Sequence, residues 1–398
     1  MTRRFSTEER RARLARRHLL LPATRTDDVV AIADAVVALH STDPVTVHLS
    51  AAARMARPSI EAVERVLYDE RTLVRHHAMR RTLWIARAEV VRWMHAACTR
   101  KQAAVEHRRT AKFLADAGRD DAEEWIAGAR KQVLDLLHTR GPLTTRQLGE
   151  ALPDLRVPIG LAPGKSYGTT ISAHTRIPLL LGFEGEVVRT RPLGTWVSGA
   201  YVWEAMDTWM PGGVGDLTEQ EGAVPLADAY LRRFGPVTQR DLQWWTGWTV
   251  ALTKHALAGC GAEQVELEDG PGWVAQDDTE SPDDEPVPDW VALLPSLDPT
   301  TMGWKDRGWY LDPACADAFD SVGNAGATIW ADGRVVGAWS MGEDGGFRSH
   351  YFLDVDAGTR TAVEAEAERL CALVGETRFS VRFPGHMQKA LSQKVPGR

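Results

Sequence analysis

The segment that decides the fold occurs twice, as GPLTTRQL at residues 141–148 and as GPVTQRDL at residues 235–242. In each copy a Gly-Pro pair ends a preceding helical run, because proline cannot continue a helix and glycine frees the backbone at its end. The next threonine can cap a second helix, and a Gln or Asp three residues later completes a capping box. The repeat therefore predicts the same pair of helices in two places, with Thr144 and Thr238 as the caps.

Each copy is followed by a further helix and a β-hairpin pattern. After the first copy we expect a helix near 168–182, and the stretch EGEVVRTRPLGTWVSG indicates a strand, a tight turn at 192–194 and a returning strand. After the second copy WTGWTVALTKHAL predicts a helix, and QVELEDG and GWVAQDD predict two strands. Helices followed by a hairpin are typical of a winged helix-turn-helix unit.

The N-terminal third fits the same plan by pattern alone. Helices are predicted at 7–20, about 27–39, about 45–56 and 59–70, and two short strands follow within 72–87. Residues 279–288, TESPDDEPVP, have the composition of a linker. The fold class is thus predicted as α+β, with three tandem winged-helix units and a C-terminal β-containing domain. The expected divisions are 1–120, 121–210, 211–288 and 289–398.

Three further patterns describe the C-terminal domain. The stretch ATIWADGRVVGAWSM predicts a β-hairpin with Asp332-Gly333 in its turn, because that dipeptide favours positive φ. Residues 360–375 are rich in alanine and glutamate and predict a helix. HYFLDV and TRFSVRF indicate more strands.

Charge is unevenly distributed along the chain, although the net charge is −7. Residues 1–110 contain 21 Lys and Arg against 12 Asp and Glu, with seven histidines, whereas residues 263–285 contain ten acidic and no basic residues. Ordinary solvated faces can produce such a pattern. A basic third beside a separate acidic loop is also what is expected when one face meets a polyanion.

The segment HSTDP, residues 40–44, interrupts two predicted helices in this basic third. His40, Thr42 and Asp43 bring an imidazole, a hydroxyl and a carboxylate within four residues, which could orient a water and stabilise a cationic transition state. The alternative is structural: Asp43 before Pro44 is equally suited to capping the next helix, with His40 packed at a helix end.

Several side chains near the predicted hairpins are candidates for DNA contacts. His76, His77, Arg80 and Arg81 lie in or beside the first hairpin, where basic residues can bind phosphates or remain as a solvated face. In the second unit Arg189 and Arg191 are further candidates. Trp244 and Trp248 share a helical face and are expected in the core.

Composition limits the chemistry and the location. The four cysteines are scattered, and the sequence contains no HExxH, GxSxG or CxxC motif, so we expect no metal and no cofactor. The sparse cysteines, the absence of a signal-like N-terminus and the lack of a long apolar run predict a soluble, cytoplasmic protein without membrane association.

Several longer stretches resemble the tandem winged-helix DNA glycosylases related to the azinomycin-resistance and crosslink-repair enzymes. They are LHSTDPVTVHLSAAAR, MRRTLWIAR, YGTTISAHTRIPLLLGFEGEVVRTRPLGTWVSGAYVW, LLPSLDPTTMGWKDR and DGRVVGAW. The resemblance extends over nearly the whole chain. It implies three winged helices around a curved, basic channel for duplex DNA, and metal-free hydrolysis of the N-glycosidic bond of alkylated purines, including bulky adducts and crosslinks.

The resemblance also places the catalytic residues. The family carries a Gln–apolar–Gln or Gln–apolar–Asp motif, often followed by Asp-Pro, and here His40-Ser41-Thr42 stands in that place before Asp43-Pro44. Neither glutamine is present. By position, His40 would orient the water or accept its proton, Thr42 would hydrogen-bond the water or sugar, and Asp43 would supply negative charge or cap the helix.

The function expected from sequence is therefore a monofunctional DNA glycosylase, acting as a monomer on alkylated bases in double-stranded DNA. A non-catalytic winged-helix DNA-binding protein, either a regulator or a damage-binding protein, is the alternative, since winged helices bind DNA without chemistry in many proteins. An inactive scaffold is a third possibility and would lack salt-dependent affinity for DNA.

Overall fold

Three successive parts of the chain share one order of elements in the computed structural model, which describes residues 2–161 and 168–393. In the second part the first strand pairs with the second hairpin strand, giving a sheet of order β4-β8-β7. Its elements are α7 (Ala122–Arg140), β4 (Leu143–Thr144), α8 (Thr145–Ala151), β5 (Pro158–Leu161), β6 (Thr169–Ser172), α9 (Arg176–Glu184), β7 (Val187–Pro192), β8 (Tyr201–Ala205) and α10 (Met206–Trp209).

The third part repeats this order with a shorter first strand. Val237 forms a bridge to Trp273 of β10, so it lies beside the second hairpin strand as β4 does in the second part. The elements are α11 (Glu219–Phe234), α12 (Gln239–Thr246), α13 (Val250–Gly259), β9 (Glu263–Leu267) and β10 (Gly270–Val274).

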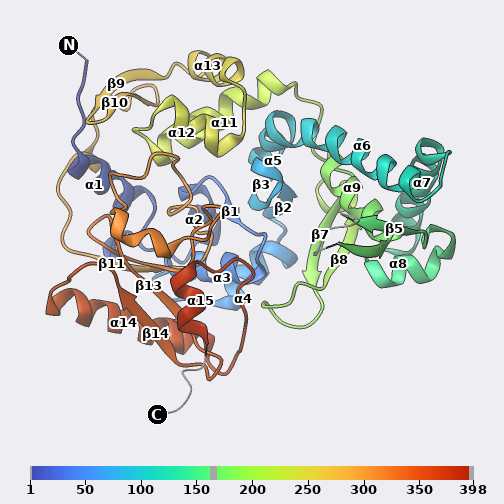
Figure 1. The fold of residues 1–398 in the computed structure, drawn as a ribbon. Helices are drawn as coiled ribbons and strands as arrows, with labels where there is room; N and C mark the ends of the chain where they lie inside the picture. Colours follow the sequence, from blue (N-terminus) through green and yellow to red (C-terminus); the bar gives the residue numbers. More distant parts are fainter. Residues whose placement is uncertain (1, 162–167, 394–398) are drawn as a thin grey trace.

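The first part has the same topology, with sheet order β1-β3-β2. Its elements are α2 (Val29–Ala35), β1 (Leu39–His40), α3 (Pro44–Ala52), α4 (Ile60–Glu64), β2 (Leu73–His77) and β3 (Leu83–Arg87), with one π-helical turn after α4. All three parts therefore agree with the predicted tandem winged-helix arrangement (Figure 1).

The helix caps predicted from the repeat are confirmed. Thr144 and Thr238 each accept a hydrogen bond from the backbone of the residue three positions on, and the side chains of Gln147 and Asp241 return the bond to the cap. Asp43 caps α3 at the equivalent place in the first part. The second helix is thus capped by a side chain in all three units, through a capping box in the second and third units and through Asp43 before Pro44 in the first.

Three local predictions were wrong. The helix expected over 27–39 ends at Ala35, and Val37 has a φ of 63°, which a helix cannot continue through. The helix expected near 168–182 begins only at Arg176, after the strand β6. The returning strand of the second hairpin begins at Tyr201, because residues 193–200 form a loop rather than the expected tight turn.

The C-terminal domain is built on an antiparallel sheet of order β11-β12-β13-β14. Its elements are β11 (Val291–Leu294), β12 (Thr328–Ala331), β13 (Arg334–Met341), β14 (Phe347–Tyr351), α14 (Ala357–Val374) and α15 (His386–Ser392). The hairpin turn at Asp332-Gly333 is confirmed, with positive φ at both residues. The strand expected in TRFSVRF is absent: this described stretch is irregular, and its Phe379 packs against Trp196 with ring centres 5.8 Å apart.

The acidic stretch is used within the protein. Helix α1 (Thr7–Arg17) lies against residues 278–286, where Arg13 and Arg17 both pair with Asp278, at 3.0 and 2.7 Å. Both arginine side chains are almost fully buried. Two of the five arginines of α1 are therefore neutralised internally, and the charge asymmetry does not by itself mark a surface for a polyanion.

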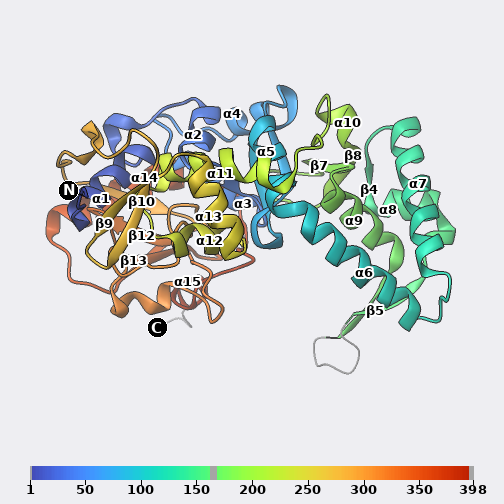
Figure 2. The same ribbon diagram turned by 90° about the horizontal axis from the view of Figure 1, so that it is seen from above.

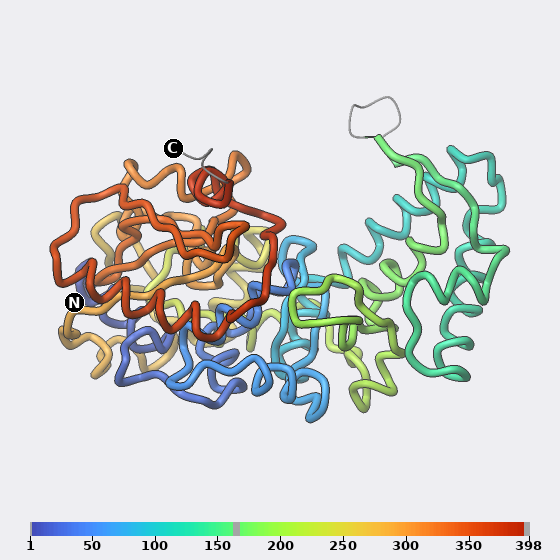
Figure 3. The backbone as a smooth tube through the Cα atoms, turned by 90° about the horizontal axis from the view of Figure 1, so that it is seen from below, coloured from blue at the N-terminus to red at the C-terminus, as the bar shows by residue number. Residues whose placement is uncertain are grey.

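One large hydrophobic core joins the first unit, the third unit and the C-terminal domain and includes four residues of the second unit, which also has two cores of its own. Figures 2 and 3 show the second unit standing to one side, connected through α5 (Ala88–Met94) and the long α6 (Arg100–Asp116). In the shared core Trp245 and Trp248 are buried, while Trp244, expected there, is only half-buried. Among the described residues, no helix combines the length and apolar character needed to cross a membrane.

Candidate functional site

The segment HSTDP lies at the strand-to-helix turn of the first unit. His40 pairs with Trp84 across the β1–β3 ladder, and the backbone N–H of Ser41 donates to the Leu83 carbonyl at 2.7 Å. Asp43 then caps α3 and Pro44 is its first residue. Asp43 thus has the capping role that Thr144 and Thr238 have in the other two units.

His40 is buried, with 4% of its surface exposed, and its ring meets Trp84 edge-on with centres 4.8 Å apart. Burial lowers the pKa of His40 to about 3, and the positive charge of Arg80 adds to this effect. The imidazole is therefore neutral at neutral pH. Its Nδ1 is buried without a hydrogen-bond partner among the described residues. A neutral ring can accept a hydrogen bond from water, but it carries no charge to stabilise an anion.

Thr42 is half-exposed, and its Oγ1 accepts a hydrogen bond from the backbone N–H of Leu83 at 3.2 Å. This contact fixes the side chain against the start of β3. It uses an oxygen lone pair and leaves the hydroxyl hydrogen available to donate. Thr42 can therefore hold a water molecule or a sugar oxygen at the surface.

Asp43 is buried, and both of its carboxylate oxygens accept backbone hydrogen bonds. Oδ1 accepts from Val45 at 3.3 Å and Oδ2 from Arg382 at 2.8 Å. Burial raises the pKa of Asp43, and the two backbone N–H groups oppose that rise. The capping interpretation is confirmed, and it extends to a second contact with the C-terminal segment.

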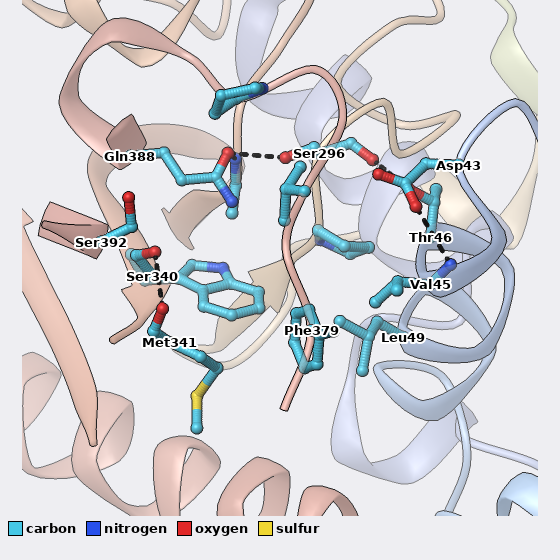
Figure 4. Close-up of a pocket in the computed structure, with 15 residues that line it drawn as sticks. Asp43, Val45, Thr46, Leu49, Ser296, Ser340, Met341, Phe379, Gln388 and Ser392 are labelled. Carbon is cyan, nitrogen blue, oxygen red and sulfur yellow. Dashed lines mark hydrogen bonds between the residues drawn. The ribbon is translucent and has the colours of Figure 1, made fainter. Parts of the chain in front are cut away.

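Asp43 also lines a small pocket between α3 and the C-terminal sheet (Figure 4). The pocket measures about 60 Å³ and is bordered by Thr46, Ser296 and Gln388 among others. Clefts that enclose small organic ligands are larger, roughly 300–1,000 Å³. This space suits a few water molecules rather than an extruded purine.

No hydrogen bond joins His40, Thr42 and Asp43 to one another within the described parts of the chain. Each side chain instead meets a different neighbour: Trp84, the Leu83 backbone and the Arg382 backbone. The structure brings the three residues into one turn without forming a hydrogen-bonded triad.

The two histidines expected to contact phosphates are buried in the structure. His76 and His95 share a hydrogen bond of 3.1 Å, and His77 stacks on Phe183 at 4.2 Å. Burial lowers the pKa of His76 and His77 far enough to keep both rings neutral. Their placement gives no support to a direct phosphate contact.

Arg80 and Arg81, at the tip of the first hairpin, differ in their surroundings although both have positive φ. Arg81 forms an ion pair with Glu106. Arg80 lies over the ring of Trp244 at 4.0 Å, with no carboxylate within 4 Å among the described residues, and its Nε is buried without an acceptor. Burial and the nearby Arg307 lower the pKa of Arg80 to about 10, so it remains a cation at neutral pH.

Arg189 and Arg191, on β7, show the same contrast. Arg191 pairs with Glu64 at 3.2 Å and Asp69 at 2.8 Å. Arg189 stacks on Trp203 at 4.9 Å, and its Nε is buried without an acceptor. Burial lowers the pKa of Arg189 to about 10, an effect increased by two more arginines, Arg75 and Arg382.

Three further arginines of this region were not predicted from the sequence to be site residues. Arg75 is fully buried and donates to the Ser41 hydroxyl at 2.8 Å and to the Arg189 carbonyl at 3.2 Å. Arg307 lies 5.4 Å from the Trp244 ring, and Arg382 lies against Gly199. Only Arg75 carried a local signal, because it adjoins His76 in the first hairpin; the other two lie far away in sequence.

Comparisons with known proteins agree with this fold. Residues 33–373 match the model of the AlkZ-like DNA glycosylase family, so the chain belongs to that family and is a DNA glycosylase by membership. Its fold is similar to that of Streptomyces sahachiroi DNA glycosylase AlkZ, with a TM-score of 0.70 and 19% sequence identity over 95% of this chain and 99% of that one. No curated protein matches it by sequence.

Proposed function

We propose that this glycosylase is monofunctional and hydrolyses the N-glycosidic bond of purines alkylated at N7 or N3 in double-stranded DNA. Bulky genotoxin adducts and crosslinks are included among the proposed substrates, which would serve DNA repair or self-resistance. The observation that most supports the proposal is the setting of His40, a neutral imidazole with an unpartnered nitrogen near the Arg80 guanidinium.

The proposed chemistry requires little acid catalysis. An N7-alkylated guanine carries a positive charge, so it departs with the electron pair of its bond to C1′ and becomes neutral. The sugar passes through an oxocarbenium-like state, to which water adds before losing a proton to solvent. The demand on the protein is to hold that water and to stabilise positive charge in the transition state.

His40 and Thr42 are proposed to hold the water. A neutral imidazole accepts a hydrogen bond from it, and the Thr42 hydroxyl hydrogen can donate to its oxygen. Asp43 is proposed to supply negative charge to the oxocarbenium-like state while it caps α3. Arg80 and Arg189 are proposed to contact the DNA backbone.

The test is a base-release assay with purified protein and duplex DNA containing N7-alkylguanine. Release above the spontaneous rate, with an abasic product, supports the proposal. DNA binding without release would overturn it in favour of a non-catalytic damage-binding protein. His40→Ala is expected to lower single-turnover release at least about 100-fold, as loss of a positioned catalytic group does. Undiminished release would remove His40 from its role.

A further inference from the structure

Two arginines near the candidate turn, Arg80 and Arg189, have the same combination of contacts. Each stacks on an aromatic ring, each has a buried Nε without an acceptor, and neither has a carboxylate within 4 Å among the described residues. A buried donor without a partner is unfavourable, and so is an unpaired buried charge. Both arginines therefore lack an anion that would satisfy them.

A second guanidinium accompanies each of these arginines. Arg307 lies over the same ring as Arg80, and its own hydrogen bonds go to backbone carbonyls and to the Met302 sulfur. Arg382 is exposed and acts electrostatically on Arg189. Adjacent like charges repel, so each pair favours the arrival of negative charge.

Tyr201 adds a further unsatisfied group on the Arg189 side. Its hydroxyl is buried without a hydrogen-bond partner among the described residues, and its ring lies 5.8 Å from the Arg189 guanidinium. On the Arg80 side, the backbone of Arg80 has a φ of 53°, which non-glycine residues rarely adopt and which is concentrated at ligand-binding positions.

The two pairs are connected to different residues of the candidate segment. Arg80 acts on His40, whereas the backbone of Arg382 bonds Asp43 and Arg75 links Ser41 to Arg189. The three residue steps from His40 to Asp43 span at most about 10 Å. Successive phosphates of one DNA strand advance about 3.4 Å along the helix axis, so two neighbouring phosphates are compatible with this upper limit.

We propose that Arg80 and Arg189 bind two backbone phosphates of the damaged strand, one on each side of the nucleotide whose base is removed. Arg307 assists Arg80, and Arg382 and the Tyr201 hydroxyl assist Arg189. This inference rests on the proposed function, because it takes the turn at His40 as the place where the sugar lies. The ligand is the phosphodiester itself, so these contacts carry no base specificity.

The neighbouring arginines provide matched controls. Arg81 is adjacent to Arg80 and Arg191 lies two residues from Arg189 on the same strand, yet both are already paired with carboxylates. Substitution of a paired arginine removes less attraction for phosphate than substitution of an unpaired one. The comparison therefore separates a specific contact from a general loss of positive charge.

The experiment measures binding of labelled, undamaged duplex DNA by fluorescence anisotropy over a series of salt concentrations. Arg80→Gln and Arg189→Gln are each expected to weaken binding about ten-fold and to reduce the slope of log affinity against log salt by about 1. Arg81→Gln and Arg191→Gln are expected to change the slope by less than half as much. Thermal unfolding of every variant checks that it is folded.

The proposal would be overturned if the slope of log affinity against log salt were the same for wild type, Arg80→Gln and Arg189→Gln. It would also be overturned if Arg81→Gln and Arg191→Gln weakened DNA binding as much as Arg80→Gln and Arg189→Gln do. If the Arg80 or Arg189 variant does not fold, Arg382→Gln is used in its place, because the Arg382 side chain is exposed. We expect Arg382→Gln to reduce the slope of log affinity against log salt in the same way. A slope equal to that of wild type would contradict the proposal. Binding does not require base release, so these results are independent of whether the protein is active.

Discussion

The carboxylate of Asp43 accepts a hydrogen bond from the backbone N–H of Arg382, 2.8 Å away and 339 positions later in the chain. The same carboxylate caps α3 through Val45. One side chain therefore fixes the candidate turn at two points, to its own helix and to the C-terminal segment. This double contact allows the structural role of Asp43 to be separated from a role of its charge.

Asp43→Asn and Asp43→Ala separate those roles. Asparagine is an equally good helix cap, but its single amide oxygen can keep only one of the two backbone contacts, whereas alanine loses both. We expect Asp43→Ala to lower the free energy of unfolding by about 1–3 kcal/mol relative to Asp43→Asn, measured by urea unfolding. If the charge stabilises the transition state, both variants lose base release at least about ten-fold. Full activity in Asp43→Asn would assign Asp43 a purely structural role.

The pH dependence of base release tests the state of His40. Because the pKa of His40 is lowered to about 3, the ring stays neutral throughout the range from pH 8 to pH 5. We expect single-turnover rates, measured at saturating enzyme, to show no inflection near the ordinary histidine value of about 6.5. A loss of activity through pH 6.5 that disappears in His40→Gln would show instead that His40 titrates there.

Buried histidines predict a protein that is sensitive to acid. Burial is the leading cause of a lowered pKa in six of them: His18, His40, His48, His76, His77 and His95. Below about pH 6.5 these histidines bind protons in the unfolded chain but not in the native state. Each of them therefore lowers the free energy of unfolding by about 1.4 kcal/mol for every pH unit below that value. The contribution of these histidines to the free energy of unfolding is fully present above about pH 6.5 and is lost as the pH falls toward their pKa values in the native state.

We expect urea unfolding at pH 7, 6 and 5 to show a free energy of unfolding that falls progressively. Proton uptake on unfolding at pH 5, measured by calorimetry in two buffers, should exceed one proton per molecule. Equal stability at pH 7 and pH 5 would contradict the neutral, buried state of these rings.

A fully buried ion pair joins the turn after α3 to the C-terminal domain. Arg54 contacts both carboxylate oxygens of Asp298 at 2.8 and 2.9 Å, and Ser50 donates to the same carboxylate at 2.7 Å. Arg54→Met would leave a buried charge uncompensated, so we expect a loss of about 3–5 kcal/mol in the free energy of unfolding.

The control for this pair is Arg57→Met, which removes an exposed ion pair with Asp27 and should leave thermal unfolding unchanged. Equal effects of the two substitutions would show that the buried pair has no special role. The charge of Asp298 also raises the pKa of His40. The base-release rates of Arg54→Met and wild type are therefore best compared at a temperature where the variant is fully folded.

Sequence predicts well what local chemistry determines. The caps at Thr144 and Thr238, the Asp332-Gly333 turn and the helix near 360–375 were recognisable because each depends on residues within a few positions. Asp43 was recognisable as a cap for the same reason. The resemblance of longer stretches then indicated the family, which the family match confirms.

Which side chains are buried or paired depends on tertiary contacts, and these could not be predicted from the sequence. Trp244 was expected in the core, but it lies half-buried beneath Arg80, because the hairpin of the first unit packs on the third. His76 and His77 are buried since the hairpin packs against helices on both sides, and Arg191 is neutralised by Glu64 from a distant helix. Which arginines remain unpaired depends on such distant partners.

The most direct test of the account is release of N7-alkylguanine from duplex DNA by wild type and His40→Ala under single-turnover conditions, corrected for spontaneous loss. The account predicts an abasic product with wild type and a rate at least about 100-fold lower with His40→Ala, while both bind the DNA. Binding by wild type without any released base would contradict it.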